Sequence, residues 1–403
     1  MAVGSGELPP LHPVAGVRLG TASAGVKKPG RRDLVVIELA AGATCAGLFT
    51  RNAFCAAPVQ VARSHLASTA PRYWVINTGN ANAGMGADGL ARAEAVCAAL
   101  AAHADVTTAE VLPFSTGVIG EPLPAERIVA ALPTALAALD DAGWALAAEG
   151  ILTTDTRPKG ACRRVPLPGG ETLTVTGIAK GAGMIRPDMA TMLAFVATDA
   201  RVAAPQLRQM LVAAAAQSFN RITIDGDTST NDALMLAATG AVAVELDAAA
   251  LEALGAAVTE VCRELAQAVV RDGEGATKFV TIVVAGGCSS AECLAVGYAV
   301  AESPLVKTAL FASDPNWGRI LAAIGRAPVD ALEVERVSVW LDEVLIAERG
   351  ARAAGYTEAA GQRVMDRAEI TIRIELGRGT CAETLWTTDL SYDYVRINAE
   401  YRT

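Results

Sequence analysis

Short apolar runs, some of them alternating with polar residues, recur along the 403-residue chain and predict β-strands. The clearest alternation lies in residues 171–178, where Leu173, Val175 and Gly177 are separated by threonines. A two-residue period of this kind places the apolar side chains on one face of a strand. Further strands are predicted at residues 33–40, 73–77, 192–198, 221–224, 278–284, 337–346 and 368–376.

Apolar residues spaced three and four apart predict helices among these strands. In residues 247–271 this spacing continues from Leu254 to Val269 and forms a single stripe. Because strands occur in neighbouring groups as well as between helices, the pattern favours an α+β fold over a doubly wound parallel sheet. The Pro- and Gly-rich joints are short, so the parts are expected to pack into one body. The other helices are predicted at residues 89–102, 125–139, 205–218, 293–311 and 317–324, and the joints at residues 158–170 and 286–290.

The composition argues against several classes of partner. The formal net charge is −9 and the basic residues are scattered, so neither a nucleic acid nor an anionic membrane surface is an expected partner. No run approaches the ~18 apolar residues of a membrane span, and the first residues lack the pattern of a secretion signal. The eight cysteines are irregularly spaced and include no C-x-x-C pair. We therefore expect a soluble cytoplasmic protein with reduced thiols.

The sequence offers no convincing metal site. His12, His65 and His103 are too far apart in sequence to form a zinc-binding pattern. Residues 225–232 (DGDTSTND) resemble a calcium loop, but Thr230 stands at the sixth position, where that loop requires glycine. The aspartates are expected instead to cap a helix that begins near Asp232.

Two glycine-containing motifs are candidates for positioning chemistry. In residues 114–120 (FSTGVIG), Gly117 can adopt backbone angles closed to other residues, so Thr116 and Gly117 could direct a hydroxyl and an N–H toward one point. From the sequence alone, an ordinary turn is the favoured interpretation of this motif. Residues 77–86 (NTGNANAGMG) could hold an anion with backbone N–H groups, although the spacing fits no phosphate loop. A tight connection near a site is the favoured interpretation.

Two further motifs follow or begin predicted helices. Residues 271–279 (RDGEGATKF) place Glu274 between two glycines at a helix end. Glu274 is there either a solvated acid beyond a glycine stop or a group that binds a cation. Residues 313–320 (SDPNWGRI) predict a helix start with Asp314 as the cap and Pro315 in the first turn.

The segment at residues 177–200 (GIAKGAGMIRPDMATMLAFVATDA) is the most informative. A glycine-rich turn joins two extended runs, and Thr191 stands just before the second run. A hydroxyl nucleophile needs a base, and the segment contains no histidine. A threonine whose own freed α-amino group accepts the proton is a recurrent solution. That solution requires cleavage between Ala190 and Thr191.

These motifs together resemble those of the ornithine acetyltransferases, also called glutamate N-acetyltransferases, of arginine biosynthesis. The matching pieces follow in order from about Asn77 to Thr403 and so cover most of the chain. The block containing KGAGMI and MATML is the most specific of them. The full set is NTGNANA, FSTGVIG, TTDT at residues 153–156, KGAGMIRPDMATML, DGDTSTND, DGEGATKF, SDPNWGRI and DYVRINAEYRT.

The resemblance implies a fold and a processing event. Members of this family have an αββα-type sandwich like that of N-terminal-nucleophile enzymes, here with a smaller C-terminal α/β portion. They cleave themselves before the threonine of MATML. This would separate an α chain, residues 1–190, from a β chain, residues 191–403, and two chains of each kind would form a heterotetramer.

The resemblance also implies the chemistry of the site. Thr191 would carry the acetyl group from N-acetylornithine to glutamate, and Thr116 and Gly117 would form the oxyanion hole. No cofactor or metal is implied, and acetyl-CoA remains open as a second acetyl donor. The substrate contacts would be Thr154, Lys180, Thr191, Glu274, Asn398 and Thr403.

Two questions remain open from the sequence. An α-amine with a pKa of about 7.7–8.0 suits the role of base better than Lys180, since a lysine has an ordinary pKa of about 10.4. A self-processing aminopeptidase or amidase of similar fold would instead give the acyl group to water. Such enzymes use serine at the cleavage site and lack the KGAGMI motif, so transfer is favoured. A binding protein that merely keeps the fold is the more distant alternative.

Overall fold

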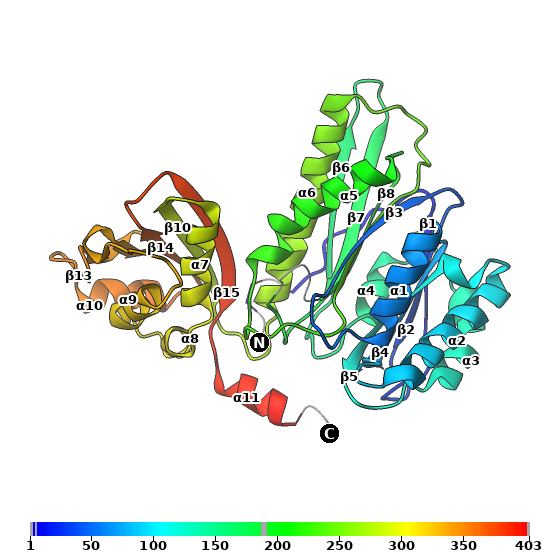
Figure 1. The fold of residues 1–403 in the computed structure, drawn as a ribbon, viewed down its shortest axis with the longest axis horizontal. Helices are drawn as coiled ribbons and strands as arrows, with labels where there is room; N and C mark the ends of the chain where they lie inside the picture. Colours follow the sequence, from blue (N-terminus) through cyan, green and yellow to red (C-terminus); the bar gives the residue numbers. More distant parts are fainter. Residues whose placement is uncertain (1–2, 5, 187–191, 401–403) are drawn as a thin grey trace.

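The computed structural model describes residues 3–4, 6–186 and 192–400, and these form three β-sheets (Figure 1). The first sheet has the order β1-β2-β4-β5 and the second the order β3-β9-β8-β7-β6. Most neighbours are antiparallel, but β4 with β5 and β8 with β9 are parallel. The first sheet comprises β1 (Val17–Ala22), β2 (Leu34–Leu39), β4 (Tyr73–Asn80) and β5 (Val111–Val118). The second comprises β3 (Thr44–Phe49), β6 (Lys159–Pro166), β7 (Thr172–Lys180), β8 (Leu193–Thr198) and β9 (Ala233–Ala238).

The two sheets face each other across an apolar core. Phe195 of the second sheet packs against Trp74 and Phe114 of the first, with ring centroids 5.7 and 5.1 Å apart. Ile37 and Met235 belong to the same buried cluster. Helix α4 (Trp144–Gly150) contributes its buried face to this core, and Ala62 of α1 (Ala57–Ser68) also belongs to it.

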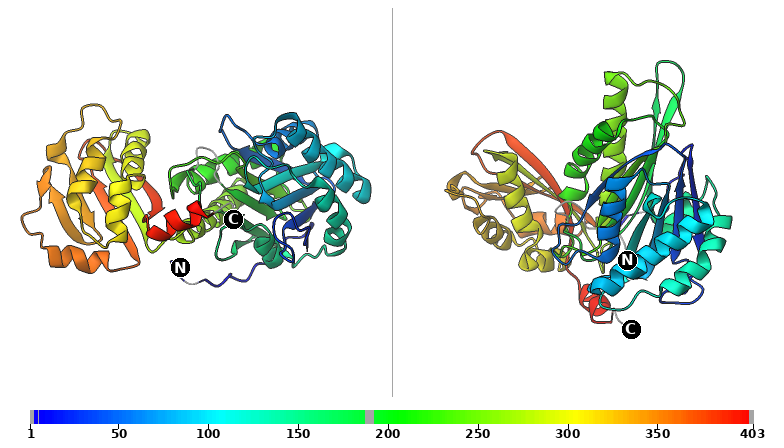
Figure 2. Two further views of the ribbon diagram at one scale, coloured as in Figure 1. Left: turned by 90° about the horizontal axis from the view of Figure 1, so that it is seen from below. Right: turned by 45° about the vertical axis from the view of Figure 1, so that its right-hand side comes forward.

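Helices cover the outer faces of both sheets (Figures 1 and 2). Over the first sheet lie α2 (Gly86–Ala104) and α3 (Ala125–Ala137), whose apolar faces pack on β2, β4 and β5. Over the second lie α5 (Ala204–Ala216) and α6 (Ala248–Arg271). The predicted αββα sandwich is therefore confirmed.

The C-terminal part forms a smaller α/β unit beside the sandwich (Figure 1). Its sheet has the order β13-β12-β11-β14-β10-β15 and is covered by helices. The strands are β10 (Phe279–Gly287), β11 (Ser338–Leu341), β12 (Val344–Glu348), β13 (Ala351–Arg352), β14 (Glu369–Glu375) and β15 (Cys381–Thr388). The helices are α7 (Ser290–Ala301), α8 (Pro304–Phe311), α9 (Trp317–Gly325) and α10 (Glu358–Met365), and α11 (Tyr392–Ala399) follows β15. Helix α11 returns the chain to the sandwich, where Asn398 meets Glu274.

The structure corrects three predicted elements. Residues 221–224 form no strand, because a short 3₁₀ turn (Phe219–Arg221) leads into a single bridge between Ile222 and Trp386. Residues 337–346 form the hairpin β11–β12, whose turn is made possible by Asp342 at φ 45°. The predicted helix at 293–311 is two helices bent by 57°, because Ser303 caps α8 just before Pro304.

Four motif predictions are also wrong in detail. No helix begins at Asp232, which directly precedes the fully buried strand β9. The predicted joint at 158–170 contains strand β6, and residues 114–118 end a strand rather than form a turn. Helix α9 is capped by Asn316, which accepts from the Arg319 N–H, rather than by Asp314.

Within the described residues, no single helix is long and apolar enough to cross a membrane. In the part of the chain that the structure describes, one bent pair, α7 and α8 taken together, has the length and composition of a span. All eight cysteines are unpaired in this structure.

Candidate active site

A cavity of about 280 Å³ lies where the carboxyl ends of β5 and β7 meet the end of α6 and helix α11. Its wall brings together side chains that are far apart in sequence. Ala190, Thr191 and Thr403 lie outside the described residues. The other residues predicted for the site all line this cavity: Thr116, Gly117, Thr154, Lys180, Glu274 and Asn398.

The backbone at Gly117 has a conformation that requires glycine. Its φ is +135°, and a Cβ atom there would overlap the backbone of Gly79. The parallel pairing of β4 and β5 is irregular at Gly79 and Asn80, and such irregularities often lie next to active sites. The close approach of two glycines therefore fixes Thr116 and Gly117 on the cavity wall.

Lys180 connects the two sheets at the cavity. Its Nζ donates a hydrogen bond to Oγ1 of Thr116 over 3.1 Å. Burial lowers the pKa of Lys180, and the nearby carboxylates of Asp155 and Asp232 oppose that shift. Lys180 also pairs with Leu193 between β7 and β8. The end of β7 thus runs beside a position two residues beyond Thr191.

Glu274 is a buried carboxylate in this cavity, so its interpretation as a solvated acid is wrong. Its side chain packs directly on Gly183, where a Cβ atom would collide with the carboxylate. The Glu274 N–H donates to the carbonyl of Ala182 over 2.8 Å. Asn398 donates its amide to Glu274 Oε2 over 2.7 Å. The KGAGM loop and helix α11 therefore hold Glu274 from two sides.

The DGDTSTND motif supports the loops around the cavity. Asp225 accepts from the N–H groups of Met184 and Ile185, over 2.6 and 2.8 Å. Asn231 donates to the carbonyls of Ala81 and Ser115, over 2.6 and 2.9 Å. These bonds tie the motif to three of the other matching pieces, NTGNANA, FSTGVIG and KGAGMIRPDMATML. In the described part of the chain, no cluster of three or more His, Cys, Asp or Glu residues could hold a metal ion.

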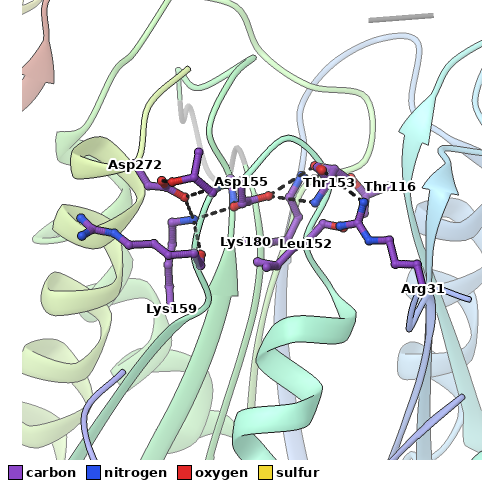
Figure 3. Close-up of polar contacts among 11 residues, drawn as sticks. Arg31, Thr116, Leu152, Thr153, Asp155, Lys159, Lys180 and Asp272 are labelled. Atoms are coloured by element: carbon purple, nitrogen blue, oxygen red, sulfur yellow. Dashed lines mark hydrogen bonds and ion pairs between the residues drawn. The ribbon is translucent and has the colours of Figure 1, made fainter. Parts of the chain in front are cut away.

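A buried ionic triad lies behind the cavity and was not predicted (Figure 3). Lys159 Nζ lies 2.6 Å from Asp155 Oδ1 and 2.6 Å from Asp272 Oδ2. All three side chains are at most 1% exposed. Asp155 stands in the TTDT motif, but no signal in the sequence pairs Lys159 with Asp272.

A second cavity, of about 190 Å³, adjoins the first and shares Gly117, Val118, Thr153 and Thr154 with it. Three basic residues line this second cavity, and the sequence did not single them out. Arg31 among them donates to the carbonyl of Leu152 over 2.6 Å. The basic residues are Lys27, Lys28 and Arg31.

Comparison with known proteins agrees with the motifs and the geometry. The ArgJ family matches residues 18–403. The chain belongs to the ArgJ family. Over 407 aligned residues it is 62% identical to the arginine biosynthesis bifunctional protein ArgJ of Pseudomonas fluorescens strain Pf0-1, with 100% of both sequences covered. The family resemblance seen in the motifs is confirmed.

Two solved structures are also similar to this ArgJ-family chain. Arginine biosynthesis bifunctional protein ArgJ from Bacillus halodurans is 36% identical with a TM-score of 0.50, and the match covers 52% of this chain and 99% of that one. Ornithine acetyltransferase from Mycobacterium tuberculosis, in complex with ornithine, is 32% identical with a TM-score of 0.39. That match covers 44% of this chain and 94% of the other.

Proposed function

We propose that this ArgJ-family chain is an acetyltransferase of arginine biosynthesis that moves the acetyl group of N-acetylornithine to glutamate. The transfer follows a ping-pong course through acetyl-Thr191. One observation supports this most strongly: a single cavity holds Thr116, Lys180 and Glu274, although they come from separate segments. The strand that begins two residues after Thr191 pairs with β7 at Lys180.

Self-cleavage prepares the nucleophile. The hydroxyl of Thr191 attacks the carbonyl of Ala190, and the amide bond between the two residues breaks, which leaves an ester and frees the α-amine of Thr191. Water then hydrolyses the ester and releases the carboxyl group of Ala190. The Bacillus halodurans chain supports this step, since it matches over 99% of its length yet covers only 52% of this chain. Because β7 precedes the cleavage point and β8 follows it, the two products share a sheet and stay paired. Two α and two β chains then form the heterotetramer.

In the transfer, the α-amine of Thr191 accepts the proton from its own hydroxyl, which attacks the acetyl carbonyl. The oxyanion is held by Thr116 Oγ1 and the Gly117 N–H, and ornithine leaves. The amine of glutamate then attacks acetyl-Thr191 through a similar oxyanion. The ester bond breaks, N-acetylglutamate forms, and the Thr191 oxygen leaves and regains its proton from the α-amine. Each well-placed donor of this kind contributes about 2.7–4 kcal/mol of transition-state stabilisation.

Lys180 strengthens the Thr116 donor. Its ammonium donates to Thr116 Oγ1, so the Thr116 hydrogen remains free to turn toward the cavity. A hydroxyl that accepts a hydrogen bond from a cation is itself a better donor, because linked hydrogen bonds polarise one another. Lys180 thus acts on the oxyanion through Thr116 and leaves the role of base to the α-amine.

Glu274 binds the ammonium or amine end of the substrates. Its carboxylate is buried, so its pairing with a cation is stronger than on the surface. Asn398 orients that carboxylate. Because both donor and acceptor are amino acids, one pocket serves them in turn. Thr154 and Thr403 complete the substrate contacts, as the family resemblance implies.

Acetyl-CoA is proposed as a second acetyl donor, and no bound cofactor is required. The word bifunctional in the name of the Pseudomonas relative supports this. The second cavity also supports it, because Lys28 and Arg31 on its wall suit the phosphates of such a donor, while Asp33 and Glu400 complete the charged lining.

The proposal is tested by incubating purified protein with N-acetylornithine, with and without glutamate. We expect N-acetylglutamate and ornithine to appear together only when glutamate is present. Acetate that forms at the same rate in both reactions would instead identify an amidase. A protein that produces neither product would be a binding protein with this fold.

A further inference from the structure

Burying the triad of Asp155, Lys159 and Asp272 costs desolvation free energy, and a contribution to stability does not explain why these charges are buried. Three charged side chains are almost completely removed from water. Desolvation of buried ion pairs is often not recovered, and apolar replacements of similar volume can be equally stable or more stable. The triad also lies outside the groups used for acetyl transfer. Its hydrogen bonds to the segments around the cavity indicate a role in the site instead.

Asp155 connects two segments of the cavity wall. It accepts from the Thr153 N–H over 2.9 Å and from the Gly181 N–H over 2.7 Å. These residues directly precede Thr154 and directly follow Lys180. One carboxylate therefore fixes the backbone beside both side chains (Figure 3).

Asp272 provides the connection to the opposite wall. It accepts from the Thr156 N–H over 3.0 Å and from the Thr156 hydroxyl. Asp272 follows the last residue of α6 and precedes Glu274 by two residues. The Lys159–Asp272 pair therefore links the segment that carries Thr154 to the segment that carries Glu274.

We propose that Lys159 and its two carboxylates are positioning residues that align the two halves of the active site after cleavage. Asp155 and Lys159 belong to residues 1–190, whereas Asp272 belongs to residues 191–403. The triad thus sets Lys180 of one product against Glu274 of the other without touching substrate. This inference rests on the proposed function, since it requires both cleavage and transfer.

The triad also sets the charge around Lys180. The titratable groups that act on Lys180 are Asp155, Asp232, Lys159 and Glu274. The carboxylates favour its ammonium form, whereas Lys159 disfavours it. Burial alone would raise the pKa of Asp155, but the ammonium groups of Lys159 and Lys180 hold that pKa well below its usual range. Lys159 thereby offsets the electrostatic attraction between Asp155 and Lys180, so Lys180 can donate its hydrogen bond to Thr116.

This charge arrangement predicts pH profiles that a purely structural role would not produce. Asp155→Asn keeps the size of the side chain and one of the two acceptor oxygens, and it removes a charge that favours the Lys180 ammonium. The alkaline limb of the kcat profile should therefore move to lower pH. Lys159→Met removes a charge that disfavours the ammonium, so the same limb should move to higher pH. Identical limbs in the parent and both variants would overturn the inference.

A neutral triad, D155N/K159M/D272N, separates positioning from stability. Lys159→Met alone leaves two buried carboxylates without their cation and should lower Tm strongly. The neutral triad should recover most of that Tm, yet its kcat should stay at least tenfold below the parent with a raised KM for glutamate. Parent-like kcat and KM in the neutral triad would overturn the inference.

Two controls keep the outcomes distinct. Lys307→Met removes another buried lysine, one that contacts Thr387 and Thr388 away from the cavity, and should retain parent kcat. If the neutral triad does not fold, Asp272→Asn alone should still lower kcat, while parent kcat in that variant would overturn the inference. The parent enzyme is assayed in parallel. Failure of the parent to form N-acetylglutamate would refute the proposed function. If the parent is active and the neutral-triad variant has the same kcat and KM, only the positioning role is refuted.

Discussion

The ammonium nitrogen of Lys180 lies 3.1 Å from the hydroxyl oxygen of Thr116, and this hydrogen bond joins the two sheets of the sandwich at the cavity. Lys180 ends β7 in one sheet, and Thr116 lies near the end of β5 in the other. The proposed oxyanion donor is thus placed by the packing of the sheets and not by a local turn.

Thr116→Ala should slow both half-reactions by about a hundredfold or more, because one oxyanion donor is worth about 2.7–4 kcal/mol. The fold should persist, since only a small polar side chain is shortened. Single-turnover acetylation and deacetylation rates provide the measurement. Formation of N-acetylglutamate at the parent rate would remove Thr116 from the oxyanion hole.

A double-mutant cycle provides the control for this prediction. If Lys180 acts through Thr116, then Lys180→Met should reduce the rate less in the Thr116→Ala background than in the parent. Thr116→Ser keeps the hydroxyl and should retain most of the parent rate. Fully additive effects of the two substitutions would show that Lys180 acts independently of Thr116.

Glu274→Gln should raise KM for glutamate and N-acetylornithine by tenfold or more and leave self-cleavage largely intact. The reason is that the neutral amide keeps the shape of the side chain but loses its attraction for a cation. Steady-state kinetics and a denaturing gel measure the two effects. Glu264→Gln on the surface of α6 is a matched control that should change neither. Equal loss of cleavage and transfer would mean that Glu274 shapes the precursor.

Lys28→Glu should raise KM for acetyl-CoA severalfold and leave KM for N-acetylornithine near the parent value. Lys28 is exposed and lines the cavity beside the site, so reversing its charge should repel a phosphate-bearing donor. Arg164→Glu makes the same charge change at an exposed position on β6 and serves as control. A comparable rise in KM for both donors would show that the second cavity has no preference for a phosphate-bearing donor.

Lys307 predicts a pH-dependent stability. Burial lowers its pKa from 10.5 to about 8 in the native protein, so the unfolded chain binds more protons between these values. The stability of the parent should therefore gain roughly 1–2 kcal/mol from this group between about pH 7 and pH 9.5. Lys307→Met lacks that gain. The Tm of the variant relative to the parent should thus be lower at pH 9.5 than at pH 7, and an unchanged difference would contradict the assignment.

The family resemblance, which rests on short contiguous motifs, implied the sandwich, and the six described residues that it implied for the site line one cavity. Gly183 of the GAGM segment is needed where Glu274 approaches closely, and Gly117 of the STG motif is needed where Gly79 does. Helix α6 was predicted from its apolar stripe because one of its faces is buried while the other contacts water.

Other features were not predictable, for physical reasons. Strand β9 is buried at every position, so it shows no alternation that would identify a strand. Strand β5 contains Pro113 and Gly117, and the proline is tolerated because β5 is an edge strand of its sheet. The Lys159–Asp272 pair joins residues 113 positions apart, a distance over which no local pattern carries information.

Intact-mass spectrometry of the purified protein under denaturing conditions tests self-cleavage and acetylation of Thr191 in one experiment. We expect two chains, residues 1–190 and residues 191–403. After addition of N-acetylornithine alone, the second chain should gain one acetyl group on Thr191, and glutamate should remove it. An active preparation that contains only the intact 403-residue chain, or that never carries acetyl on Thr191, would contradict the account.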